Sequence, residues 1–147
     1  MEATTRWAHL FGRLLLAAIF LIAALGKLAN WHGTAVMAAG KGIPEILLAV
    51  ATALEILGGL SILTGFKARW GAVVLIVFLV PVTLVFHNFW ALEGAQQQMQ
   101  QVNFLKNVAI FGGLLVVYAV GAGELSLDAW LARRAGHGGA ELRQQHA

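Results

Sequence analysis

One acidic side chain lies near the middle of a long apolar stretch. Glu55 stands about 11 residues into the apolar run 44–64, which places it roughly 16 Å along a helix. A carboxylate at that depth in hydrocarbon costs several kcal/mol unless it faces a partner or a wet cavity. We therefore take Glu55 as the candidate catalytic residue, able to exchange a proton with a bound molecule. The alternative is that Glu55 is only a structural hydrogen-bonding group between helices.

Other polar side chains recur at helical spacing within the apolar runs, and buried polar groups must face the interior. We expect the polar faces to converge into a funnel that opens outward, with Glu55 at its floor. Lys106 is the first basic residue expected to reach Glu55, and Lys27 is the second; both lie close enough to the interface to turn outward instead. The candidate binding residues are Lys27, Thr52, His87, Asn103, Lys106 and Asn107.

Four apolar runs must position these side chains. They cover residues 8–28, 44–64, 70–90 and 104–120, each near the roughly 20 residues that cross a bilayer as a helix. Hydrophobic residues make up 59% of the 147-residue chain, and charged residues only 12%, against about 25% in a soluble domain. The sequence predicts an all-α, integral membrane four-helix bundle, with residues 1–125 as one transmembrane domain and 126–147 as an amphipathic, flexible cytoplasmic tail.

Basic residues predict the orientation of this bundle. With both termini in the cytoplasm, seven Lys and Arg lie on the inner side and three, Lys27, Lys41 and Lys106, on the outer side. The positive-inside rule favours that N-in, C-in arrangement in a bacterial-type inner membrane. Arg13 is expected to anchor the first helix at the inner headgroups. The same reasoning explains the net charge of +3 without nucleic-acid binding.

Loops and small residues complete the predicted architecture. Residues 29–43 form a glycine-containing outer link, and the glutamine-rich residues 91–103 form either a short interfacial helix or a solvated loop. Pro81 should kink the third helix because it removes a backbone donor. Glycine pairs allow helices to approach closely in lipid. The structural candidates are Pro81, Gly58, Gly59, Gly112 and Gly113.

Several kinds of chemistry are disfavoured by the residue types present. The chain contains no cysteine, so it cannot exchange disulfides or hold an iron–sulfur cluster by thiolates. His9 and His87 fall at opposite ends of the predicted bundle, so no bis-histidine haem is expected. No zinc-ligand spacing or phosphate-binding loop is present. A quinone is the one cofactor that we consider compatible with the polar funnel.

Three segments together resemble the DoxX family of small membrane proteins. They are GKL at 26–28, ALEILGGLSILTGFKARWGA at 53–72, and Gln101 followed by FLKN and AIFGGLL at 104–115. The resemblance covers roughly residues 8–123. It implies kinship with small membrane subunits of a terminal quinol oxidase and of thiosulfate:quinone oxidoreductase. By position it marks the polar motif residues Lys27, Glu55, Gln101, Lys106 and Asn107.

The leading functional hypothesis is a membrane subunit of a quinone-linked oxidoreductase complex. A redox partner protein is expected, because the chain has no evident electron carrier of its own. In this interpretation Glu55 exchanges a proton with the quinone, and Lys106 or Lys27 adjusts the proton affinity of Glu55. His87 donates a hydrogen bond to a quinone carbonyl. The alternatives are a small proton-coupled transporter and a non-catalytic membrane scaffold. Outward-facing glycine and aromatic surfaces are compatible with a homo-oligomer.

Overall fold

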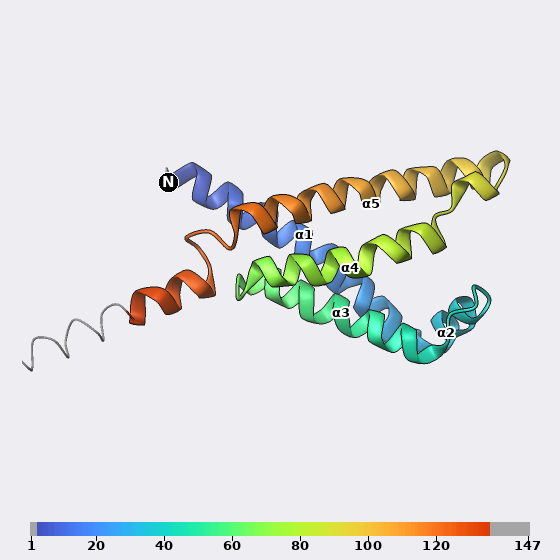
Figure 1. Ribbon diagram of the computed structural model, residues 1–147, viewed down its shortest axis with the longest axis horizontal. Coiled ribbons are helices and arrows are strands. Elements are labelled where there is room, and N and C mark those ends of the chain that lie inside the picture. Colours follow the sequence, from blue (N-terminus) through green and yellow to red (C-terminus); the bar gives the residue numbers. More distant parts are fainter. Residues whose placement is uncertain (1–2, 136–147) are drawn as a thin grey trace, which may run out of the picture.

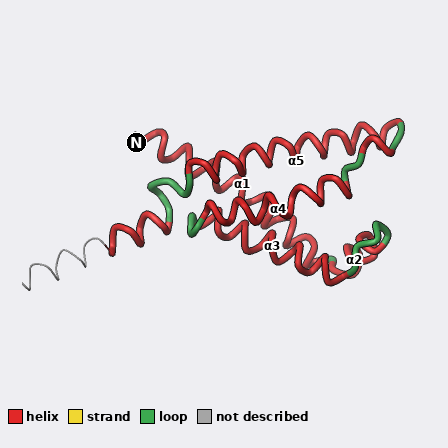
Figure 2. The backbone as a smooth tube through the Cα atoms, viewed as in Figure 1, coloured by secondary structure: helices red, strands yellow, loops and turns green. Residues whose placement is uncertain are grey.

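The computed structural model describes residues 3–135, and in that range the chain forms helices and short loops without a strand (Figures 1 and 2). Four helices are long and apolar enough to cross a membrane, which confirms the predicted all-α membrane architecture. A last helical segment covers residues 127–135. The labelled helices are α1 (Ala3–Ala29), α2 (Trp31–Ala39), α3 (Glu45–Thr64), α4 (Ala68–Phe86), the 3₁₀ helix η1 (Phe89–Ala91) and α5 (Gly94–Val120).

The long helices pack in the order α1, α3, α4, α5, each mainly against the next. Because α1 and α5 touch little, the helices form an open row rather than a closed ring. Figure 1 shows α5 diverging from α3 towards the side that carries α2. We call this side the α2 end, and the opposite side, which holds the α3–α4 turn and residues 121–135, the tail end.

Close packing at the centre depends on small residues. Ala17, Ala72 and Leu75 are fully buried, and the rings of Phe20 and Phe78 meet edge to face at 6.4 Å. A Cβ at Gly58 would lie 2.5 Å from Leu75 Cγ, so this glycine lets α3 and α4 approach. Large apolar side chains cover much of the outer surface, as expected of a surface that faces lipid.

The glycine pairs differ in their roles. Gly59 lies against α1, where a Cβ would come within 2.8 Å of Leu21 Cδ2, so Gly58 and Gly59 both serve packing. Gly113 meets Leu16 at ordinary contact distance, whereas a Cβ at Gly112 would meet nothing within 4 Å. Gly112 has no neighbour to pack against among the described residues, so its packing role stays a prediction. Helix α4 continues through Pro81 without interruption.

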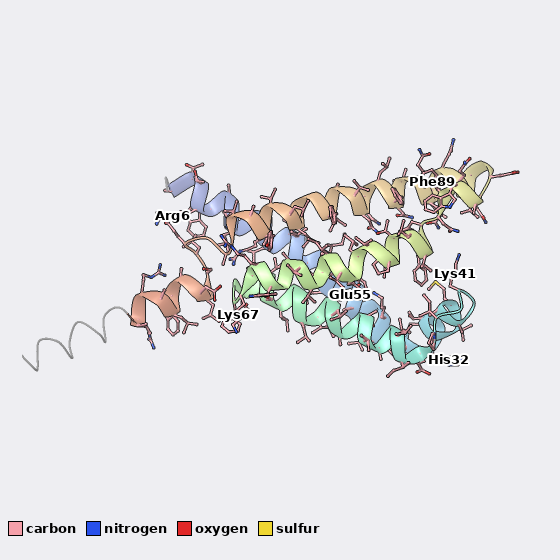
Figure 3. All side chains as sticks on the ribbon, in the orientation of Figure 1. Arg6, His32, Lys41, Glu55, Lys67 and Phe89 are labelled. Atoms are coloured by element: carbon pink, nitrogen blue, oxygen red, sulfur yellow. The ribbon has the colours of Figure 1, made fainter. Side chains whose placement is uncertain are left out.

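Both predicted outer links contain helix. The 29–43 link folds into α2, which begins after Asn30, whose side-chain oxygen accepts a hydrogen bond from Gly33 N at 3.3 Å. The glutamine-rich segment is helical, but it is the first part of α5 rather than a separate interfacial helix. Basic residues lie at both ends of the bundle, with Arg6 and Lys67 at the tail end and Lys41 at the α2 end (Figure 3). Which end faces the cytoplasm stays a prediction, and the predicted flexible residues 136–147 lie outside the described range.

Candidate functional site

An ion pair between α1 and α3 contains the central glutamate. Lys27 Nζ lies 2.6 Å from Glu55 Oε2 and donates a second hydrogen bond to Oε1 at 2.9 Å. The Glu55 side chain is only 4% exposed, whereas that of Lys27 is 24% exposed. Figure 3 places Glu55 near the middle of the bundle's length, as its position in the run predicts. The carboxylate is therefore more deeply buried than the lysine side chain with which it pairs.

Lys27 also lines a cavity of about 260 Å³. Helix α2 contributes Thr34 and Met37 to it, and α3 contributes Leu47 and Leu48. Its volume is slightly below the roughly 300–1,000 Å³ of pockets for drug-sized ligands, which suits a single ring. Met37 and Leu47 are each more than half exposed, so the cavity also borders an apolar outer face.

The wall formed by α4 carries the second polar group of this cavity. His87 lines it beside Phe86, Val82 and Phe78. The His87 Nδ1 atom is 2.7 Å from Gln100 Oε1, which belongs to the first part of α5. Lys27, Thr34 and His87 are thus the polar residues among those that line an otherwise apolar cavity.

The remaining candidate residues do not join this cavity. Thr52 is buried and donates its hydroxyl to Leu48 O of its own helix at 2.9 Å. Asn107 Nδ2 donates to Thr83 Oγ1 at 2.9 Å and so joins α5 to α4. Lys106 is exposed and donates to Asn103 Oδ1 at 3.0 Å.

Two expectations from the sequence are therefore wrong. Lys27 pairs with Glu55 in place of Lys106, because the α1 face packs directly on α3 while Lys106 lies on the outside of α5. The four polar faces do not converge either, since α5 packs mainly on α4 and contacts α1 and α3 only a little. The polar groups form one cluster between α1 and α3 and another between α4 and α5.

Arg13 also differs from the expected headgroup anchor. Its side chain is 2% exposed and lies under the segment that follows α5. Nη2 donates to Leu125 O at 2.8 Å, while Nε and Nη1 have no hydrogen-bond partner among the described residues. The guanidinium packs against Gly65, the left-handed residue that ends α3. Arg13 thus holds residues 121–128 onto the tail end.

Sequence reasoning missed the contribution of α2 to the cavity. Thr34 and Met37 lie in a segment that we expected to be an irregular link. The available signal was Asn30 before a short run without proline, since asparagine is a favoured residue immediately before a helix. Gln100 was missed because its partner, His87, is separated from it by a connection of unpredictable geometry.

Comparison with known proteins identifies the family. The DoxX family model matches residues 8–88, which include both residues of the ion pair. The chain belongs to the DoxX family. It is 34% identical over 125 residues to the inner membrane protein YqjF of Escherichia coli K12, covering 85% of this chain and 92% of YqjF. It is 31% identical to YphA of the same organism, covering 81% of this chain and 86% of YphA.

More distant similarity extends to longer eukaryotic proteins. The Surfeit locus protein 4 homolog of Schizosaccharomyces pombe is 29% identical over 82% of this chain but only 36% of its own length. No solved structure matches the chain at a significant level. The four spanning helices and the two Escherichia coli relatives make this DoxX protein a multi-pass inner membrane protein.

Proposed function

We propose that this DoxX protein is the membrane subunit of a quinone-linked oxidoreductase complex, and that the cavity beside Lys27 binds the quinone head. The observation that carries the proposal is a lysine that lines an apolar cavity and is paired with a more deeply buried carboxylate. A lysine ammonium has three N–H groups. Two hydrogen bonds to Glu55 leave a donor for a ligand carbonyl.

The cavity walls suit an aromatic ring with an apolar tail. Phe78, Phe86 and Leu48 surround the space with carbon, and the exposed Met37 and Leu47 connect it to the outer apolar surface. A quinone head would accept a hydrogen bond from Lys27 while its isoprenoid tail lay along that surface. This combination of a mostly apolar pocket with few polar groups is typical of small-molecule sites.

Glu55 has a proton-holding role in this proposal. Interconversion of a quinone and its quinol moves two electrons and two protons. The electrons pass to or from a redox partner protein, and Lys27 with Glu55 is the adjacent route for a proton. The carboxylate is less accessible than the ammonium, so Lys27 contacts the head and Glu55 supports it.

The same pairing bears on the transporter alternative. A proton-coupled exporter of cationic molecules needs its carboxylate to face the substrate. Here both Glu55 oxygens accept hydrogen bonds from Lys27, and the cavity presents a positive group. These contacts support a ligand with carbonyl or other acceptor groups over a cationic one.

The test is binding of a benzoquinone with a decyl tail to the purified protein in lipid nanodiscs. The double variant Lys27→Met/Glu55→Met removes both charges without leaving either one unpaired, so it should fold while binding at least tenfold more weakly. Lys106→Met is the matched control, because that lysine is exposed on α5, away from the cavity. Equal binding by a folded double variant, or no binding by the native protein, would count against a quinone site and favour the scaffold alternative.

The partner requires a separate experiment. The tagged protein is purified from its native membranes in a mild detergent, and the associated proteins are identified by mass spectrometry. A stoichiometric redox protein is expected. A clean homomer would contradict the subunit role even if the quinone binds.

A further inference from the structure

Two cavities adjoin each other beside the α3–α4 turn, at the tail end of the bundle. The larger, of about 430 Å³, lies between α3 and α4, and the smaller, of about 240 Å³, lies between the start of α4 and the segment that follows α5. Lys67 and Trp70 line both cavities. Figure 3 shows Lys67 at this turn, away from the central Glu55, so neither cavity belongs to the proposed quinone site.

The smaller cavity is lined by two basic residues. Lys67 is exposed, and within residues 3–135 its ammonium group has only the ring of Phe66 as a partner, 5.6 Å from the centroid. Arg69 Nη2 donates to Ala119 O at 3.2 Å, which uses one of the five N–H groups of the guanidinium. A Cβ on Gly121, which lines this cavity, would lie 3.2 Å from Arg69 Nε, so the guanidinium borders the space. Both cations therefore keep donors for an anion.

The carboxylate of Asp128 lines the same cavity, but its charge is already engaged. Asp128 Oδ2 accepts a hydrogen bond from Lys67 N at 2.9 Å. Arg13, buried beneath this segment, is close enough for its positive charge to act on Asp128. Because Arg13 offsets the one acidic residue of the lining, the charges of Lys67 and Arg69 leave the smaller cavity net positive.

The larger cavity is an apolar groove. Leu60 and Val74 contribute carbon to its walls. Its two hydroxyl groups already donate to the backbone, Ser61 Oγ to Phe66 O at 2.6 Å and Thr64 Oγ1 to Leu60 O at 2.8 Å. The groove therefore suits a hydrocarbon chain rather than a polar ligand.

The residue at the junction of the two cavities indicates their depth in the membrane. The Trp70 side chain is 70% exposed, and amphipathic indoles prefer the boundary between hydrocarbon and headgroups. Lys67 and Arg69 flank the start of α4 and so lie at the same level. A phospholipid whose phosphate lay in the smaller cavity would then have an acyl chain beside the groove between α3 and α4.

We propose that these two cavities together bind one anionic phospholipid, with its phosphate between Lys67 and Arg69 and an acyl chain in the α3–α4 groove. Basic pockets between transmembrane helices attract anionic headgroups in this way. A phosphatidylglycerol headgroup has a negative phosphate and no ammonium group, which matches the two cations. Phosphatidylethanolamine also carries an ammonium group, which the two cations repel. This site is independent of the proposed quinone cavity.

The experiment titrates delipidated protein in a mild detergent with dioleoyl phosphatidylglycerol or dioleoyl phosphatidylethanolamine and counts bound lipids by native mass spectrometry. The native protein should bind one phosphatidylglycerol about tenfold more tightly than phosphatidylethanolamine. Lys67→Gln/Arg69→Gln should weaken phosphatidylglycerol binding about ten- to thirtyfold, since each basic residue near an anionic headgroup contributes roughly fivefold. Arg133→Gln/Arg134→Gln is the matched control, because it removes the same charge from the same end but alters neither cavity lining.

The contribution of the groove needs a variant that leaves the charges unchanged. Val74→Trp fills the groove and should weaken phosphatidylglycerol binding several-fold. Val77→Trp is its control, since Val77 is 62% exposed on α4 and lines neither cavity. An unchanged α-helical circular dichroism signal and melting temperature would show that each variant is folded.

Three results would overturn the proposal. Equal affinity of the native protein for the two lipids would mean that the cations do not select a headgroup. Equal losses in the two arginine and lysine double variants would show attraction to general surface charge rather than to a site. Displacement of the lipid by inorganic phosphate, with no effect of Val74→Trp, would leave only a site for a small anion.

Discussion

Two basic residues on one face of α1 meet very different surroundings. Lys27 is paired with a carboxylate at 2.6 Å and is still partly exposed, to a cavity near the α2 end. Arg13 is more deeply buried at the tail end, and its hydrogen-bond partner among the described residues is the carbonyl oxygen of Leu125. Lys27 thus combines a paired charge with partial exposure, whereas Arg13 combines a deeply buried charge with a backbone partner.

The difference indicates separate roles for the two ends of the bundle. A buried ion pair that borders a cavity can take part in binding, because a ligand reaches one partner while the other supports it. A buried guanidinium covered by the chain's own backbone instead connects two segments, here α1 and residues 121–128. Arg13 therefore connects two segments of the fold, whereas Lys27 is the residue that we propose to contact a ligand.

The largest effect is expected from breaking the ion pair on one side. Lys27→Met leaves the Glu55 carboxylate buried without its counter-charge, which should reduce the free energy of unfolding by about 3–5 kcal/mol. Adding Glu55→Met should recover most of that loss, since an apolar pair of similar volume replaces the ions. Unfolding in detergent, followed by the α-helical circular dichroism signal, measures both values.

Lys106→Met is the control for this comparison. That lysine is exposed and donates to Asn103, so its loss should change stability by less than about 0.5 kcal/mol. A loss as large as that of Lys27→Met would mean that Lys106, as the sequence first suggested, is the partner that matters.

A second prediction concerns the turn against which Arg13 packs. Gly65 has φ of 70° and touches the Arg13 guanidinium, so Gly65→Ala should cost about 2 kcal/mol from backbone strain and displacement of the arginine. Gly42 is the matched control, with φ of 74° and open space where a Cβ would lie. Gly42→Ala should cost only the backbone share, about 1 kcal/mol. Equal losses in thermal unfolding would show that the Arg13 contact contributes nothing.

Removing the guanidinium itself should have a smaller and more local effect. Arg13→Met abolishes the hydrogen bond to Leu125 O, but it also removes two buried nitrogen atoms that lack partners among the described residues, so the net loss is about 1 kcal/mol. Hydrogen exchange should accelerate at residues 121–135 and stay unchanged around Glu55. Faster exchange throughout the bundle would contradict the separation of the two ends.

Sequence patterns were sufficient to predict the helical architecture, but not to predict which side chains pair with each other. Apolar runs of spanning length determine helices, because hydrocarbon leaves backbone groups no other way to be satisfied. Glu55 was correctly placed near the centre from its position in its run. The choice of Lys27 over Lys106 was not predictable, since it depends on α1 packing directly on α3 while α5 packs mainly on α4. Helical spacing shows which residues share one face of a helix, but it does not show which neighbouring helix packs against that face.

The smallest expected effect comes from the neutral contact between α4 and α5, which serves as the reference for the ion pair. Asn107 donates to Thr83 at 2.9 Å, and interhelical hydrogen bonds of this kind in membranes average only about 0.6 kcal/mol. A double-mutant cycle with Asn107→Leu and Thr83→Val should give a coupling energy near that value, several times smaller than the coupling of Lys27 with Glu55. If the two couplings were equal, charge would add nothing to the α1–α3 contact. Glu55 would then be a hydrogen-bonding group like Asn107, and the argument for a charged binding site beside it would lose its basis.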